Sequence, residues 1–147
     1  MAQVRQASAH WSGDLTSGGG AVSASSSGIF SDQAITWRAR TEASEGKTSP
    51  EELLAAAHAS CYSMAVSNEL AKAGFPPERV DVSVVVSADK TDAGWTVVSS
   101  AITLRAVVPG VDAATFDELA EAAKGGCPIS RAISDSVEIT LDATLEG

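Results

Sequence analysis

Two cysteines, Cys61 and Cys127, are the side chains in this sequence best suited to chemistry. They are 66 positions apart, which fits neither a CxxC motif nor the ligand spacing of a zinc site. Two thiols that the fold brings together support peroxide reduction. One thiolate attacks the peroxide and becomes a sulfenic acid, the second thiol condenses with it to a disulfide, and an external dithiol reduces that disulfide.

Each cysteine also has a purely structural interpretation. Cys61 lies in a small and apolar stretch, where a free cysteine packs as a small hydrophobic residue. Cys127 stands between Gly126 and Pro128, at the expected start of a helix, where free amide groups favour a thiolate. A turn cysteine with no chemical role is the alternative there, and the residues alone leave both alternatives open.

A reactive thiolate needs a cation that lowers its pKa, and an acidic group that holds that cation in place. Arg40 and Glu51 are available in the segments that lead to the Cys61 helix. Glu51 precedes Cys61 by ten residues, nearly three helical turns, so we expect an arginine between them rather than a direct contact. Solvated charge at a strand edge is the plain alternative for Arg40 and for Arg38.

Local patterns predict the elements that position these residues. Ser49 and Glu52 have the spacing of a capping box, and the helix they begin is expected to run from Pro50 to about Ala73. Because nearly every side chain from Leu53 to Val66 is small or apolar, we expect this helix to be buried on all sides.

Strands are predicted on both sides of this helix. The expected elements are a strand over 34–40, a hairpin of 80–87 and 95–108, a helix beginning near Asp112, a short helix from Pro128 to about Ser134, and a closing strand over 137–145. This order indicates an α+β fold with a largely antiparallel sheet. The length of 147 residues suits a single domain, residues 1–147.

Charge and composition exclude several function classes. The net charge of −9, from 10 basic and 19 acidic residues, argues against binding to nucleic acid or to an anionic membrane surface. The sequence has neither an apolar run of about 18 residues nor the apolar core of a signal peptide, so we expect a cytoplasmic protein with reduced thiols. His10 and His58 are the only histidines, and we expect no metal site and no cofactor.

Several stretches together resemble one known family. They are Ala9–Asp14, Ser49–Met64, Asp89–Gly94, Val108–Ala113 and Ala123–Ser130. In this order they resemble the OsmC/Ohr family of thiol peroxidases over essentially the whole chain. The histidine at His58 and the long segment before Trp37 are more similar to the OsmC branch than to the Ohr branch.

The resemblance implies an enzyme of oxidative-stress defence that reduces organic hydroperoxides and, more weakly, hydrogen peroxide. It implies that Cys61 is the peroxidatic cysteine and Cys127 the resolving one. Glu51 matches the carboxylate that orients the active-site arginine. We prefer Arg40 as that arginine, and Arg38 stays open.

The resemblance also implies partners. It predicts an intertwined homodimer, with sheets wrapped around two long central helices and active sites at the interface, and a dithiol or lipoyl-bearing protein as reductant. We expect Phe30, Met64 and Phe75 to wall the peroxide pocket, and His58 to be a packing or interface residue. The competing interpretations are a non-enzymatic redox-responsive stress or binding protein, and a structural dimer with inert thiols.

Overall fold

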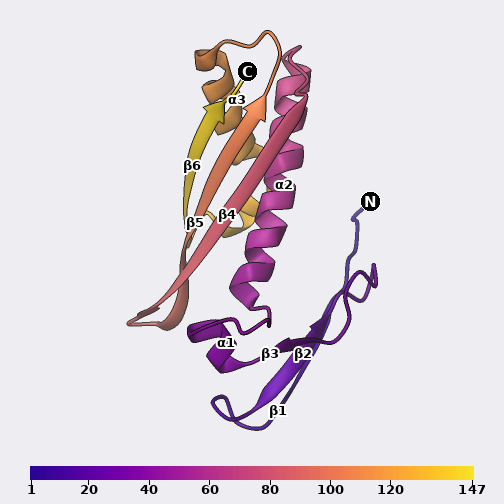
Figure 1. The fold of residues 1–147 in the computed structure, drawn as a ribbon, viewed down its shortest axis with the longest axis vertical. Coiled ribbons are helices and arrows are strands. Elements are labelled where there is room, and N and C mark those ends of the chain that lie inside the picture. Colours follow the sequence, from indigo (N-terminus) through magenta and orange to yellow (C-terminus); the bar gives the residue numbers. More distant parts are fainter. The chain divides into compact units, whose positions relative to one another are not determined.

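The computed structural model describes residues 1–147 and divides them into two compact units, Met1–Leu53 and Leu54–Gly147 (Figure 1). The elements are β1 (Ser8–Ser12), β2 (Gly19–Ser23), β3 (Gln33–Ile35), α1 (Trp37–Thr41), α2 (Pro50–Lys72), β4 (Arg79–Thr91), β5 (Gly94–Val107), α3 (Ala113–Gly126), α4 (Pro128–Ile133) and β6 (Glu138–Leu145). None of these helices has the length and apolar character needed to cross a membrane. The prediction of one domain over the whole chain stays a prediction.

The first unit contains a small antiparallel sheet in which β2 lies between β1 and β3. A Cβ atom at Gly20 would stand 2.0 Å from the His10 carbonyl oxygen, so only glycine fits at that point of β2. Asp14 closes the turn after β1. The hydroxyl and amide of Ser17, together with those of Thr16, donate to its carboxylate and hold the pKa of Asp14 at about 2.

The segment that carries the arginines is a helix, and the predicted strand over 34–40 is wrong beyond Ile35. Thr36 begins the helix, because its hydroxyl oxygen accepts a hydrogen bond from the Ala39 amide at 3.1 Å. This cap outweighs the apolar–polar alternation that suggested a strand. Arg38 and Arg40 therefore point about 200° apart around α1 instead of sharing one face.

The second unit contains a three-stranded sheet with β5 in the centre. β4 and β5 form the predicted antiparallel hairpin, with Val80 opposite Ala106. β6 pairs parallel to β5, with Ser99 opposite Glu138, because α3 and α4 form a crossover that returns the chain to the same end of the sheet. The α+β class is confirmed, with a mixed sheet here in place of a purely antiparallel one.

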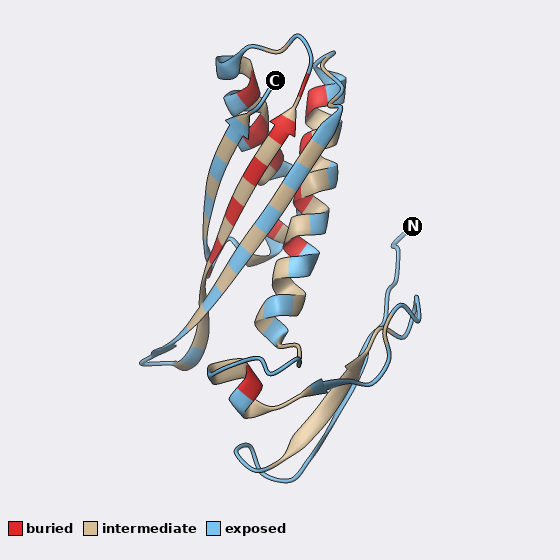
Figure 2. Cartoon of the chain, viewed as in Figure 1, coloured by how far each residue is buried: buried red, intermediate tan, exposed pale blue.

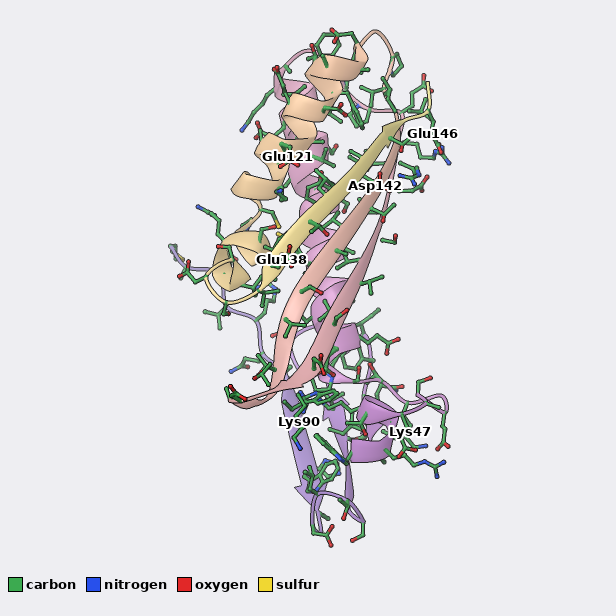
Figure 3. All side chains as sticks on the ribbon, turned by 90° about the vertical axis from the view of Figure 1, so that its left-hand side faces the viewer. Lys47, Lys90, Glu121, Glu138, Asp142 and Glu146 are labelled. Carbon is green, nitrogen blue, oxygen red and sulfur yellow. The ribbon has the colours of Figure 1, made fainter.

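One face of this sheet packs against α2 and α3 to form the core (Figure 2). The buried core residues come from three elements and two loops. They are Tyr62, Val66 and Leu70 of α2, Ile102, Leu104 and Ala106 of β5, Phe116, Ala120 and Ala123 of α3, and the loop residues Val108 and Cys127. The outer face of β6 carries the exposed Glu138 and Asp142, whereas Glu121 projects from α3 (Figure 3).

The bounds of α2 agree with those predicted. The Ser49 hydroxyl accepts from the Glu52 amide at 3.1 Å, while the Glu52 carboxylate bonds the Thr48 hydroxyl instead of returning to Ser49. At the other end, Gly74 has a positive φ of 92°, and the Phe75 amide closes the helix on a carbonyl five residues earlier.

The expected burial of α2 on all sides is wrong for the single chain. Its buried residues form one stripe, which consists of His58, Tyr62, Val66 and Leu70. Met64, on another side of the helix, is 67% exposed. Within the second unit the sheet and α3 cover one side of α2, and Ala57, Ser60 and Met64 are exposed on its other side.

Tyr62 connects α2 to α3, because its buried hydroxyl donates to the Ala120 carbonyl oxygen at 3.0 Å. We expect Tyr62→Phe to lower the free energy of unfolding by about 1 kcal/mol, since one buried hydrogen bond is lost while the ring still packs. Urea unfolding followed by circular dichroism measures this. Tyr62→Leu, which also removes the ring, serves as a control and should destabilise more. An unchanged midpoint for Tyr62→Phe would contradict the expectation.

Candidate active site

The second unit brings the two cysteines together. Cys61 lies on α2 and Cys127 lies just before α4, and their Sγ atoms are 3.0 Å apart. Both are free thiols; Cys127 is fully buried and Cys61 is partly exposed. This separation is about 1 Å longer than a disulfide bond, so a small movement is enough to join the sulfurs.

The junction of α3 and α4 fixes the position of Cys127. The residue is at once the C-cap of α3 and the N-cap of α4, as predicted from its place before Pro128. Proline has no amide hydrogen, and the amides that follow it are free of helix partners. The backbone amides of Ile129 and Ser130 face this helix start and favour the thiolate of Cys127, although the Cys127 side chain forms no cap hydrogen bond.

These surroundings shift the two thiols in opposite directions. Burial raises the pKa of Cys61, and the contact with Cys127 raises it further, although the Ile129 amide and the charge of Arg131 act the other way. Burial also disfavours the Cys127 thiolate, but hydrogen bonds from Cys61 and Ser130 outweigh it and lower the pKa of Cys127. The Cys127 thiol donates to the Cys61 sulfur across the 3.0 Å contact. Because burial raises the pKa of Cys61, a nearby cation would favour its ionisation.

A cavity of about 350 Å³ opens beside Cys61. Its lining is mostly apolar and includes Met64 and Ala65 from α2 and Pro128 from α4, with Asn68 and Glu69 as its polar members. Of the three expected wall residues, the structure therefore places Met64 at this cavity. An apolar cavity next to a thiol suits a ligand with one polar reactive end and a hydrocarbon body.

The two phenylalanines of the expected wall lie elsewhere. Phe75 follows the end of α2 and packs against the core, and it does not line the cavity at Cys61. Phe30 belongs to the first unit, where it lines a separate cavity of about 210 Å³ with Gln33, Thr48 and Leu53. Nothing in their sequence surroundings distinguished these two aromatic residues from Met64.

Arg40 and Glu51 form an ion pair in the first unit. The Arg40 Nε and Nη2 atoms donate to Glu51 Oε1 at 3.0 and 2.8 Å, and the Glu51 side chain is only 12% exposed. The guanidinium also lies 5.8 Å from the centre of the Trp37 ring. A two-atom contact of this kind fixes both the position and the orientation of the cation.

Arg38 has different surroundings. Its side chain is 66% exposed and pairs with Glu42 at 3.0 Å and with Glu45 at 3.5 Å, both on the surface of the first unit. Of the two arginines that the sequence left open, Arg40 is the one that contacts Glu51. Arg38 corresponds to the solvated charge described as the plain alternative.

His58 makes contacts that the sequence did not indicate. It is fully buried, with Nδ1 2.7 Å from Ser100 Oγ of β5 and Nε2 2.8 Å from Ser130 Oγ of α4. Burial lowers the pKa of His58 and so favours the neutral ring. One signal was present: Ser100 has the same strand parity as the buried Ile102 and Leu104, and a polar residue on a buried face needs a partner.

Comparisons with known proteins agree on one family. The model of the OsmC-like protein family matches residues 43–142. The chain is 44% identical to the Peroxiredoxin OsmC of Escherichia coli over 142 residues. This alignment covers 97% of this chain and 96% of that protein. It is 32% identical over 117 residues to the Organic hydroperoxide resistance protein OhrA of Bacillus subtilis, with 76% and 77% covered. The higher identity to the OsmC protein agrees with the predicted branch.

A solved structure shows the same fold. It is the crystal structure of an organic hydroperoxide resistance protein OsmC from Legionella pneumophila. Its TM-score is 0.71 at 26% sequence identity, with 97% of this chain and 98% of that chain covered.

Proposed function

This chain belongs to the OsmC-like protein family, and we propose that it reduces organic hydroperoxides to alcohols through a sulfenic acid at Cys61 and a disulfide with Cys127. Its class, a thiol peroxidase, follows from that membership and from the names of its relatives. The observation that carries the proposal is the 3.0 Å approach of the two free thiols beside an apolar cavity.

The proposed reaction has three balanced steps. The Cys61 thiolate attacks the terminal oxygen of the hydroperoxide, the O–O bond breaks, and the alkoxide takes a proton and leaves as an alcohol. The Cys127 sulfur then attacks the oxidised Cys61 sulfur, and the hydroxide that leaves combines with the Cys127 proton to form water. A dithiol finally reduces the disulfide, giving two electrons to the sulfurs and one proton to each.

Arg40 is the proposed cation for this thiolate, and Glu51 is the group that orients it. Two observations support these roles. The two-atom contact with Glu51 fixes the guanidinium of Arg40. The pKa of Cys61 is raised by burial, so an ionised Cys61 requires a nearby positive charge.

The proposed substrate preference depends on the lining of the cavity at Cys61. Met64 and Ala65 offer apolar surface to the organic part of a hydroperoxide, which hydrogen peroxide lacks. We also propose that the uncovered side of α2, where Met64 is exposed, packs against a second copy in a homodimer with active sites at the interface. The reductant is proposed to be a small dithiol or a lipoyl-bearing protein.

Mass spectrometry of the peroxide-treated protein tests the role of Cys127. After one equivalent of cumene hydroperoxide without reductant, we expect the wild-type protein to lose two hydrogens as an intramolecular disulfide. Cys127→Ser should instead gain one oxygen and stop as the sulfenic acid, which a dimedone probe traps.

Each result has a clear alternative. A wild-type protein that forms no intramolecular disulfide would show that Cys127 is not the resolving cysteine. A disulfide that forms without turnover in the presence of excess dithiol would favour the non-enzymatic, redox-responsive interpretation.

A further inference from the structure

The last turn of α3 contains two glycines, Gly125 and Gly126, that the backbone and the packing of this chain do not require. Neither has a positive φ, so their backbone conformation is open to any residue. A Cβ atom at either position would meet no atom within 4 Å beyond its own helical turn, so no close approach excludes a side chain. Glycine is also less favourable than alanine in a helix. The two glycines therefore lower the stability of α3 without a gain within this chain.

The need to end α3 does not account for them either. The Cys127 amide still donates to the Ala123 carbonyl oxygen at 2.9 Å, so the helical hydrogen bonds continue past both glycines. Pro128 then ends the series, because proline has no amide hydrogen. Gly74 shows the contrast, since it closes α2 with a φ of 92° that other residues rarely adopt. The open space beside the two glycines of α3 is the feature that remains to explain them.

The two glycines border different open spaces. Gly126 lines the cavity of about 350 Å³ beside Cys61. Gly125 lines a separate cavity of about 360 Å³, which has Lys124 and Arg131 in its lining. A side chain at position 126 would therefore take volume from the cavity at the reactive thiol, whereas a side chain at position 125 would not.

We propose that Gly126 is a specificity-determining residue, because its missing side chain keeps the cavity at Cys61 wide enough for the hydrocarbon part of an organic hydroperoxide. The inference rests on the proposed function, since it assigns this cavity to that substrate. Met64 in the same lining has a flexible side chain that adapts to a ligand. A methyl group at position 126 would instead be fixed to the backbone of α3, and it has no rotamer in which it leaves the cavity.

A single added methyl group tests the proposal. We compare kcat/KM for cumene hydroperoxide, which carries a phenyl group, with kcat/KM for hydrogen peroxide, which has no organic part. In a reaction with separate oxidation and reduction halves, each of these values reports the oxidation of Cys61 alone. We expect Gly126→Ala to lower the ratio of the two values about tenfold, and Gly126→Val to lower it further.

Gly125→Ala is the matched control, because it adds the same methyl group one residue earlier, at the other cavity. Its ratio should equal that of the wild type. Both alanine variants should unfold at the same urea concentration as the wild type or at a higher one, since alanine favours a helix and its Cβ meets no neighbour. Gly126→Ala should therefore combine an unchanged or raised stability with a lowered preference for the organic substrate, a combination that a damaged fold would not give.

Protection of Cys61 tests the same cavity without turnover. In a Cys127→Ser background, Cys61 is the only cysteine, and its alkylation by iodoacetamide is followed by mass spectrometry. The alcohol formed from cumene hydroperoxide should occupy the cavity and slow this alkylation. We expect Gly126→Ala to weaken the protection and Gly125→Ala to leave it unchanged. A wild-type protein without peroxidase activity would reject the proposed function, while this measurement would still decide the role of Gly126.

Three results would overturn the proposal. One is a Gly126→Ala protein with the wild-type ratio of the two kcat/KM values. Another is an equal fall of that ratio in Gly125→Ala, which would show that the effect does not depend on the cavity at Cys61. The third is a Gly126→Ala protein that slows with both peroxides alike and changes its oligomeric state in light scattering, which would assign the open space to a second copy of the chain. If Gly126→Val does not fold, Gly126→Ala carries the test.

Discussion

Cys61→Ser is expected to remove peroxide reduction almost completely, with a fall in kcat/KM of about three orders of magnitude or more. The substitution changes one atom and leaves the shape of the side chain nearly intact. A serine hydroxyl does not ionise in the range where a thiol does, and its oxygen cannot accept the peroxide oxygen to form a sulfenic acid. Because the first step of the proposed reaction occurs at this atom, no later step can compensate.

The measurement is the consumption of cumene hydroperoxide by reduced protein in the presence of a dithiol. Cys127→Ser is the matched control, since it removes the other sulfur of the same 3.0 Å contact. It should still react once with peroxide, whereas Cys61→Ser should not react at all. Steady turnover by Cys61→Ser would rule out the proposed mechanism, provided that both variants unfold at the same urea concentration as the wild type.

Local signals in the sequence were sufficient to predict α2. A serine cap, a proline in the first turn and a glycine after the last turn lie within a few residues of the ends they determine. Such signals can be read from the sequence because the hydrogen-bond donors and acceptors at a helix end belong to residues that are close along the chain. The same kind of signal was missed at Thr36, whose cap turns the arginine segment into α1.

Features that depend on contacts between distant elements could not be predicted in this way. Alternation along 138–145 is the same for a parallel and an antiparallel strand, so it gave no indication that β6 lies parallel to β5. The 66 positions between the cysteines did not require that they meet, and the family resemblance supplied that expectation. The contacts of His58 come from β5 and α4, and no spacing within α2 indicates them.

Arg40→Ala is expected to lower kcat/KM by about a hundredfold, because the proposed reaction uses the Arg40 guanidinium as the cation of the Cys61 thiolate. The direction in which the pH profile of activity moves follows from the sign of the charges near Cys61. Burial already raises the pKa of Cys61, and the loss of a cation would raise it further, so the thiolate would form only at higher pH. The rise of activity with pH should therefore move upward, and part of the lost activity should return in alkaline buffer.

Arg38→Ala is the matched control for this prediction, because it removes the same charge two residues away. Arg38 is exposed and pairs with Glu42 and Glu45, whereas Arg40 is fixed on Glu51 through two nitrogen atoms. We expect Arg38→Ala to keep nearly the full activity and the wild-type pH profile, and Glu51→Gln to share the defect of Arg40→Ala in weaker form.

Equal losses in the two arginine variants would mean that general surface charge, and not the Arg40–Glu51 pair, supports the thiolate. An Arg40→Ala protein with an unshifted pH profile would show that Cys61 ionises without this cation, and the Ile129 amide and Arg131 would then be the remaining groups that favour its thiolate.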